Sequence, residues 1–412
     1  MWQVKVASTE FPHRLGTAKV TLTTGDGQPL ANTSLSVAQV DHDFLFGNIG
    51  FDLLDYAGGT DTSAATARLA EDYLAVFNAV TLPFYLGRFE AVRGQPDTAR
   101  LLAAARWFVD RGVTVKGHPL VWHTSQPAWL TDLPTPEVGQ VLRQRIQREV
   151  GGFAGVIDWW DAINELVIMP VFTAEANGVT RLAWAKGRLA MARLAFGEAK
   201  AANPEARLLI NDFDLSSAYE CLIEGLLAAG LPIEAIGLQT HMHQGFKGED
   251  YLIDKVEKFA RYGRPLHFTE TSLVSGHLMP PDIVDLNDFQ VADWPSTPAG
   301  EERQAEEMVR HYRCLLAQPA VEAITYWGLS DQGAWLGAPV GLIRRDGTPK
   351  PSYDALKSLI KGDWWVARQA GATDAAGQFE LTGFRGRYAV TVAGQRQIVH
   401  LGADSDIAVA VV

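Results

Sequence analysis

The chain has 412 residues, of which 47% are hydrophobic and 20% charged, and its formal net charge is −12. This length accommodates one large domain of roughly 250 residues plus a smaller unit, and the low charge content excludes a mainly disordered chain. The acidic balance argues against a nucleic-acid partner, because phosphate backbones require clustered Lys and Arg.

The chain carries no obvious disulfide or membrane signal. Its two cysteines, Cys221 and Cys314, both lie in stretches of helical periodicity, so no disulfide framework is expected. No apolar run reaches the length of a membrane span, so no membrane partner is expected either. Residues 1–6 read as a strand and lack the features of a signal peptide, which predicts an intracellular chain or a trimmed secreted form. The oligomeric state is left open.

Residues 1–41 are predicted to form β-strands. Val20, Leu22 and Thr24 alternate with other residues before a Gly-Asp-Gly turn, and a second strand-like run covers residues 35–40. These strands are too few to form a stable sheet alone.

Residues 42–362 alternate short apolar strands with longer segments of helical period, which is typical of βαβ units. Helices are expected, for example, at 97–111 and 180–202. Eight strands are predicted, near 44–51, 80–85, 113–122, 157–166, 207–213, 235–242, 265–272 and 323–331. Eight such units close naturally into a (β/α)8 TIM barrel of the α/β class. A doubly wound open sheet is the alternative, but no Gly-rich phosphate loop follows the first strand.

Residues 363–412 return to β-type alternation and are too short for a sheet of their own. We therefore predict that they complete an accessory β-sandwich with residues 1–41, with the barrel inserted between the two halves. The phrases GDGQPLANTSLSV and TDAAGQFELTGFRGRYAVTV loosely resemble the halves of a transthyretin-like or carboxypeptidase-regulatory-like sandwich. Two separate β caps on the barrel are the alternative.

Two predicted strands end in a glutamate, and the active sites of such barrels lie at the strands' C-terminal ends. The fourth strand leads to Glu165 and the seventh to Glu270. Two carboxylates facing each other across a barrel mouth are typical of glycosidic bond cleavage, in which one protonates the leaving oxygen and the other attacks the anomeric carbon. A retaining enzyme would hold the two carboxyl groups about 5–5.5 Å apart.

The other strand ends supply aromatic and planar polar side chains of the kind that bind sugars. They include GHPLVWH at the third strand, QTHMH at the sixth, and Trp327 and Trp335 at and after the eighth. Trp107 and Trp184 lie within predicted helices and are expected to be core residues.

Taken in order, these motifs resemble glycoside hydrolase family 10, the endo-β-1,4-xylanases. The matching phrases, over about residues 42–360, are GHPLVWHTSQPAWL, WWDAINE, LLINDFDL, IGLQTHMH, FTET and ITYWGLSDQGAW. The resemblance implies Glu165 as acid/base and Glu270 as nucleophile. It implies sugar-binding roles for Asn164, His118 and Gln239, a contact between His241 and the nucleophile, walls made of Trp122, Trp327 and Trp335, and structural support from Asn211.

The second strand departs from the family. A Glu-Asn…Lys group that binds the next sugar is usual there, whereas this chain has residues 80–88, VTLPFYLGR, so Tyr85 or Arg88 would have to substitute. Ser272 stands where the family has an acid that orients the histidine. These changes leave the type of reaction, glycosidic bond hydrolysis, as expected, but they put the specificity for xylan in question.

Two rival interpretations stay open. His241 and His243 face the same side of a strand and, with His118 and His123, could suit a metal-dependent amidohydrolase. Such enzymes would carry a histidine pair on the first strand, where this chain has residues 47–50, GNIG. A non-catalytic carbohydrate-binding barrel is the other rival.

We predict retaining hydrolysis of β-1,4-linked xylan or xylo-oligosaccharides, without metal or organic cofactor. The Pro/Asp-rich stretch 276–300 is predicted to cover part of the bound polymer. Another β-glycoside is the alternative substrate.

Overall fold

The computed structural model describes residues 1–411, which form two compact units. One unit combines residues 1–45 with the residues from Pro351 onward, and the other comprises residues 46–350. Within residues 1–411, no helix combines the length and apolar character needed to cross a bilayer.

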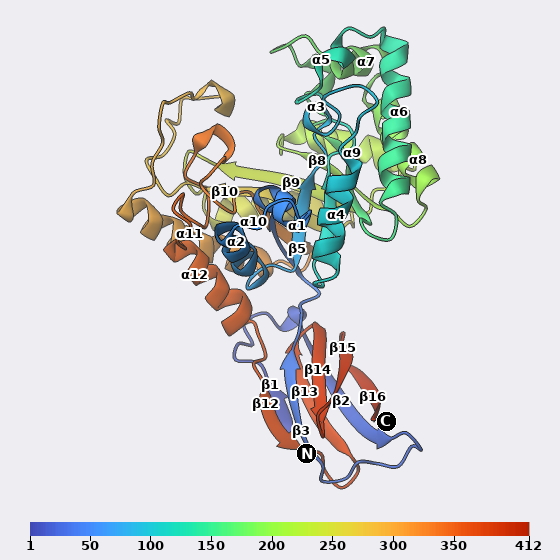
Figure 1. Ribbon diagram of the computed structural model, residues 1–412, viewed down its shortest axis with the longest axis vertical. Coiled ribbons are helices and arrows are strands. Elements are labelled where there is room, and N and C mark those ends of the chain that lie inside the picture. The colour runs from blue at the N-terminus through green and yellow to red at the C-terminus, as the bar shows by residue number, and fades with distance from the viewer. Residues whose placement is uncertain (412) are drawn as a thin grey trace. The chain divides into compact units, whose positions relative to one another are not determined.

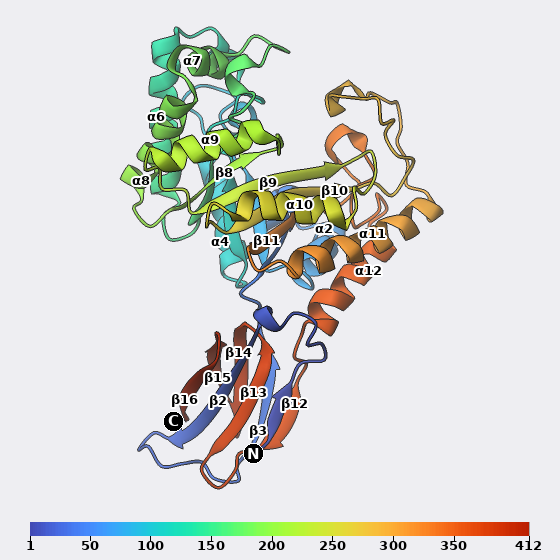
Figure 2. The same cartoon turned by 180° about the vertical axis from the view of Figure 1, so that it is seen from behind.

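A closed barrel of eight parallel strands forms the larger unit, and Figures 1 and 2 show the helices around it. The strands in chain order are β4 (Leu45–Ile49), β5 (Ala79–Pro83), β6 (Thr114–His118), β7 (Trp159–Asn164), β8 (Arg207–Asp212), β9 (Ala235–Met242), β10 (Leu266–Leu273) and β11 (Val321–Tyr326). They are almost continuously buried, as expected for strands with the barrel interior on one face and helices on the other. The predicted (β/α)8 barrel and its eight strands are confirmed.

Helices follow the barrel strands, and the last of those given below belongs to the smaller unit. They are α1 (Leu54–Ala57), α2 (Ala64–Leu74), α3 (Leu86–Phe89), α4 (Thr98–Val109), α5 (Ala128–Thr131), α6 (Thr135–Gly152), α7 (Gly178–Lys186), α8 (Arg188–Ala202), α9 (Ser217–Ala228), α10 (Glu249–Ala260), α11 (Pro298–Leu316) and α12 (Pro351–Ser358). The helix predicted at 180–202 is divided into α7 and α8 by Gly187, whose φ of 80° is incompatible with a continuous helix. The expectation that Trp184 is a core residue is wrong: α7 buries Leu182 and Ala183, and Trp184 is 74% exposed.

The smaller unit contains two four-stranded sheets. One has the order β1 (Gln3–Lys5), β13 (Gln378–Phe384), β2 (Leu15–Thr24) and β16 (Ser405–Val411). The other has the order β12 (Gln369–Ala372), β3 (Ser34–Gln39), β14 (Gly386–Val392) and β15 (Gln395–Leu401).

Each sheet interleaves strands from the two ends of the chain. β3 pairs with both β12 and β14, and β2 pairs with both β13 and β16. Alternate residues of these strands are buried, including Val20 and Leu22 of β2 and Phe379 and Leu381 of β13. The accessory sandwich built from both terminal segments is therefore confirmed, and the alternative of two separate caps is wrong.

The limits of this unit differ from the domain limits of 1–41, 42–362 and 363–412 that we predict from the sequence. Residues just beyond those limits pack within the smaller unit. The His42 ring lies 3.1 Å from the carbonyl oxygen of Ile360 and contacts the ring of Trp365. Periodicity alone does not reveal such contacts, because a change from strand to helix need not coincide with a change of packing partner.

Candidate active site

All nine predicted site residues lie at the C-terminal ends of the barrel strands or in the loops that follow. His118 ends β6, Trp122 follows it, Asn164 ends β7, Glu165 follows directly, Gln239 and His241 lie on β9, Glu270 lies on β10, Trp327 follows β11, and Trp335 lies further along the same loop. Hydrogen bonds and ring contacts described below connect all nine into one cluster.

Both strands that lead to the glutamates have an irregular register. The pairing of β7 with β8 skips Ala162, and the pairing of β10 with β9 skips Thr269, directly before Glu270. Such bulges redirect side chains and are concentrated beside active sites. As a result Glu270 stands opposite Gln239 on the neighbouring strand.

Amide side chains join the two glutamates. Asn164 Nδ2 donates to Glu165 Oε1 at 3.2 Å, and Asn164 Oδ1 accepts from Asn211 Nδ2 at 2.8 Å. Asn211 Nδ2 also donates to Glu270 Oε1 at 2.8 Å. Gln239 Nε2 donates to Asn164 Oδ1 at 3.1 Å and to Glu165 Oε1 at 3.3 Å. Asn211, expected to support the acid/base, therefore contacts the other carboxylate directly.

Glu165 occupies an environment that favours its protonated form. Burial raises the pKa of Glu165 to about 8; the Trp122 hydrogen bond opposes this shift, and the negative charges of Glu270 and Asp212 add to it. Trp122 Nε1 donates to Glu165 Oε2 at 2.7 Å. The backbone of Glu165 has a φ of 57°, an uncommon conformation for a non-glycine residue that surrounding contacts must hold in place.

Glu270 occupies the opposite environment. Burial would raise the pKa of Glu270, but the His241 hydrogen bond and the charges of His118 and His241 outweigh burial and hold it below its ordinary value. His241 Nε2 lies 3.1 Å from Glu270 Oε2, and His241 Nδ1 lies 2.9 Å from Ser272 Oγ. The Ser272 hydroxyl donates to the carbonyl oxygen of Trp327 at 3.4 Å. Its oxygen can therefore accept from His241 Nδ1, which fixes the ring so that Nε2 donates to Glu270.

A buried charged group supports His118, and the sequence reasoning missed it. His118 Nδ1 lies 2.6 Å from Asp161 Oδ2, and Lys116 Nζ lies 3.1 Å from the same oxygen. Burial would raise the pKa of Asp161, but Lys116 and His118 hold it below its ordinary value. His118 Nε2 is 3.9 Å from Glu270 Oε1. The signal available in the sequence was the presence of two charged residues, Lys116 and Asp161, inside apolar barrel strands.

Tyr85 belongs to the aromatic wall of the site. Its ring centroid lies 5.5 Å from that of Trp122 and 5.6 Å from that of His118. Burial and the charge of Glu270 raise the pKa of Tyr85 well above its ordinary value, so its hydroxyl keeps its proton. Arg88, the other candidate from the second-strand region, is exposed on α3. Of the two candidates, the structure places Tyr85 beside the site residues.

Two further tryptophans contact the histidines of the site. Trp327 is buried, and its ring lies 5.2 Å from His118 and 6.2 Å from His241. Trp335 is 38% exposed, and its ring lies 5.1 Å from His241 and 5.2 Å from His243. A partly exposed indole above buried polar groups suits the less polar face of a sugar ring.

The other histidines of the cluster are neutral. Burial lowers the pKa of His123 to about 4, and burial together with the charge of His241 lowers that of His243 to about 3. Among residues 1–411, no group of three or more His, Cys, Asp or Glu side chains is arranged to hold a metal ion. His241 is already engaged by Glu270 and Ser272.

The sequence pattern of glycosyl hydrolase family 10 matches residues 86–359, well over half of the chain. The chain belongs to this family. The matched region contains both glutamates and six of the barrel strands, β6 to β11. It begins directly after Tyr85, so residues 80–85 of the altered second-strand region lie outside it.

Relatives of this family 10 chain include proteins named as xylanases. Endo-1,4-beta-xylanase 3 of Hypocrea jecorina is 26% identical over 259 residues, which are 61% of this chain and 65% of that protein. Endo-1,4-beta-xylanase B of Thermotoga neapolitana is 29% identical over 60% of this chain and 69% of that protein. The anti-sigma-I factor RsgI6 of Acetivibrio thermocellus is 26% identical over 68% of this chain but only 33% of that protein. The match thus spans less than two thirds of the first and third relatives.

Solved structures share the family 10 barrel. Xylanase 10B from Thermotoga petrophila RKU-1, solved in complex with xylobiose, superposes with a TM-score of 0.63 at 22% identity, covering 77% of this chain and 94% of that one. Xylanase Xyn10A from Cellvibrio japonicus, solved as a thermostable mutant, gives 0.61 at 24% identity, covering 78% of this chain and 98% of that one. At these identities the likeness concerns the fold.

Proposed function

We propose that the chain hydrolyses β-1,4-xylosidic bonds in xylan or xylo-oligosaccharides with retention of anomeric configuration. Glu165 is the acid/base and Glu270 the nucleophile. The proposal rests on one observation: two glutamates on the same amide network occupy opposite environments, which raise the pKa of Glu165 to about 8 and lower that of Glu270. Such a pair, one carboxyl protonated and the other ionised, is what double displacement requires.

In the first step the ionised Glu270 attacks the anomeric carbon, and the bond to the leaving oxygen breaks as Glu165 transfers its proton to that oxygen. The product is a glycosyl ester on Glu270 and a free alcohol. In the second step Glu165, now ionised, takes a proton from water while the water oxygen attacks the anomeric carbon. The ester bond breaks, and Glu270 regains its negative charge.

The surrounding residues serve these steps by position. Asn211 and His241 hydrogen-bond to separate oxygens of Glu270, which stabilises the negative charge before attack and after release. Trp122 holds Glu165 by its second oxygen. The amide groups of Asn164 and Gln239 lie beside Glu165, within reach of the hydroxyls of a sugar bound between the carboxylates.

Turnover of an aryl β-xyloside tests the proposal. We expect Glu270→Ala to reduce kcat by several orders of magnitude. Glu165→Ala should reduce it strongly for a poor leaving group but much less for an activated phenol, which needs no proton. Glu175 is an exposed glutamate in the loop after β7, and the Glu175→Ala variant is the matched control, which should retain full activity. Proton NMR should detect the β-anomer first, and initial formation of the α-anomer would overturn the retaining mechanism.

A second candidate is a carbohydrate-binding barrel without turnover. Two observations favour this candidate. One relative is named an anti-sigma-I factor rather than an enzyme, and the region before Leu86, where the family usually binds a sugar, is altered in this chain. Binding of xylohexaose with no product after prolonged incubation would favour it over hydrolysis.

A product profile on xylo- and gluco-oligosaccharides tests the third possibility, that another β-glycoside is the substrate. Faster hydrolysis of the glucosides would reject xylan specificity and leave the two-glutamate mechanism in place.

A further inference from the structure

Two long loops beside the site, residues 274–297 after β10 and residues 327–350 after β11, share a small apolar core. We call it the loop core. Its buried members are Val274, Met279, Trp294, Ala338 and Val340, and Ile283, Leu286, Phe289, Ala334 and Leu336 pack against it. Trp294 is its largest side chain, 5% exposed, and donates from Nε1 to the carbonyl oxygen of His277 at 2.7 Å.

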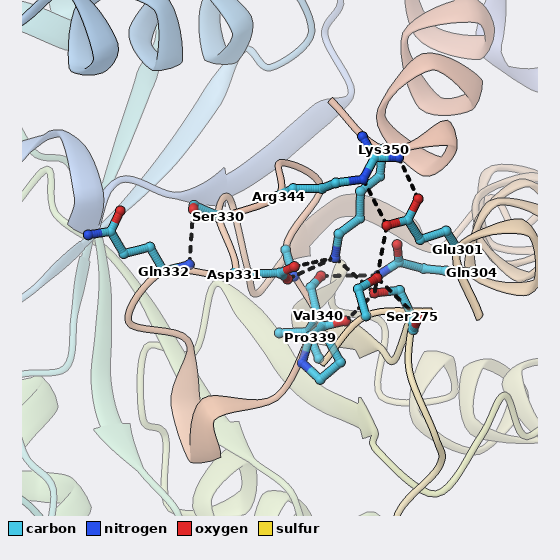
Figure 3. A network of polar contacts seen from close by, with 12 residues as sticks. Ser275, Glu301, Gln304, Ser330, Asp331, Gln332, Pro339, Val340, Arg344 and Lys350 are labelled. Carbon is cyan, nitrogen blue, oxygen red and sulfur yellow. Dashed lines mark hydrogen bonds and ion pairs between the residues drawn. The ribbon is translucent and has the colours of Figure 1, made fainter. Parts of the chain in front are cut away.

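A buried polar network ties the bases of the same two loops together (Figure 3). Lys350, which is 0% exposed, donates to Asp331 and to Ser275 Oγ, each at 2.8 Å. Ser275 Oγ donates to the carbonyl oxygen of Pro339 at 2.7 Å, and Asp331 accepts from the Gly341 amide at 2.8 Å. A charge pair buried away from solvent is stable only when hydrogen bonds satisfy its polar groups. The bases of the two loops therefore have little freedom to move.

Between these anchors the loop that carries Trp335 has an unusual backbone. Leu336 has a φ of 60°, which is uncommon for a residue with a branched side chain, and its side chain packs against the loop core. Backbone strain of this kind persists only where surrounding packing enforces it, and it is concentrated at functional sites. The loop core is the packing that enforces it here.

A series of ring contacts leads from the loop core to the nucleophile. The Trp294 ring lies 6.1 Å from that of His243, which lies 5.2 Å from Trp335 and 5.8 Å from His241. His241 contacts Glu270. Neither ring nitrogen of His243 finds a hydrogen-bond partner among the described residues 1–411, so this histidine acts as a neutral spacer between the rings.

We propose that Trp294 is a positioning residue for Trp335. Its ring supports that of His243, and together with Leu336 it presets the Trp335 ring beside His241, as a platform for a sugar next to the nucleophile. This inference rests on the proposed function and gives the 274–297 loop a role in substrate binding, because the base of the loop fixes one wall of the site. The loop tip, where Val284 is 98% exposed, takes no part in this.

Trp294→Ala tests the proposal because it removes the support and leaves Trp335 and both glutamates in place. We expect KM for xylotetraose to rise about tenfold while kcat changes less than twofold, since the platform acts on binding rather than on the reacting atoms. Trp294→Phe, which keeps an aromatic ring, should restore most of the affinity. Val284→Ala on the loop tip is the matched control and should behave as wild type.

A double-mutant cycle separates positioning from general destabilisation. If Trp294 acts through Trp335, Trp294→Ala should weaken xylotetraose binding about tenfold when Trp335 is present but less than twofold in a Trp335→Ala background. Equal weakening in both backgrounds would overturn the proposal, as would a Trp294→Ala protein with unchanged affinity.

The dissociation constant is measured by calorimetry on Glu270→Ala proteins, which bind without turnover. The cycle therefore gives an answer even if the wild type proves inactive, and failure of the proposed hydrolysis is distinguished from failure of the positioning role. Thermal denaturation of each variant verifies that the compared proteins are folded.

Discussion

Asn211 donates hydrogen bonds of 2.8 Å to Glu270 Oε1 and to Asn164 Oδ1 from the same amide nitrogen. One amide group therefore orients the proposed nucleophile and the residue that precedes the proposed acid.

Asn211→Asp should disturb the nucleophile. The substitution keeps the shape but replaces a donor with an acid beside Glu270, so an ionised Asp would raise the pKa of Glu270. We expect kcat/KM to fall by about 10²-fold, as for other preorganised donors, with the acidic limb of the pH profile moving to higher pH. An acidic limb at the wild-type position would contradict the role of Asn211.

The alkaline limb should report Glu165. Because burial raises the pKa of Glu165 to about 8, the acid retains its proton at neutrality and loses it above about pH 8. We therefore expect kcat/KM on xylo-oligosaccharides to decline with a midpoint near pH 8. A midpoint near pH 5 would show that the carboxyl is not the protonated acid.

The raised pKa values also make stability depend on pH. Glu165 and Asp212, with folded-state pKa values of about 8 and about 7, bind protons in the folded state that the unfolded chain releases above pH 4–5. Since the folded state binds more protons at these two sites in this window, their contribution to the free energy of unfolding should fall as pH rises from 5 to 8. The buried histidines with lowered pKa, such as His123 and His243, act in the opposite direction below about pH 7. Urea unfolding at several pH values isolates Glu165: the free energy of unfolding of the wild type should fall relative to that of Glu165→Gln, whose amide does not titrate, as pH rises from 5 to 8. A difference between the two proteins that does not change with pH would reject a protonated Glu165.

Tyr85 should matter more than Arg88 for substrate binding. Tyr85→Ala removes a ring that packs against Trp122 and His118, and we expect kcat/KM to fall about tenfold, mainly through KM, in line with the 1–3 kcal/mol typical of a lost pocket contact. Tyr85→Phe should stay within threefold, and the exposed Arg88→Ala serves as the control. A larger loss for Arg88→Ala than for Tyr85→Ala would reverse this assignment.

The Lys350 network should contribute strongly to stability. Lys350→Met leaves Asp331 buried without its charged partner, and we expect the free energy of unfolding to fall by about 3–5 kcal/mol. Arg345→Met removes an exposed pair with Asp293 from the same loop and should cost no more than about 1 kcal/mol. Denaturant titration compares the two variants. Similar losses of unfolding free energy would show that the buried Lys350 pair contributes no more to stability than an exposed pair.

The barrel could be predicted because its strands are buried on both faces, so each appears as a short apolar run between helical segments. The strand-end positions of Glu165 and Glu270 followed from the same pattern. The register shifts at Ala162 and Thr269 could not be predicted, because a skipped residue leaves the sequence pattern of a buried strand unchanged.

Contacts between distant loops were equally hidden. Trp294 lies in a stretch without periodicity, and its partner His243 reads as a possible metal ligand until its buried, unpaired nitrogens are seen. Tyr85 could be suggested only as one of two candidates, since its position depends on how the chain leaves β5.

The interleaving of β3 between β12 and β14 has a consequence for biosynthesis. When β3 leaves the ribosome, both of its neighbours lie more than three hundred residues downstream, so roughly fifteen to sixty seconds pass at ordinary elongation rates before they arrive. Throughout that time β3 lacks both strands that cover its edges in the folded protein, and an unpaired edge is a template for pairing with another chain.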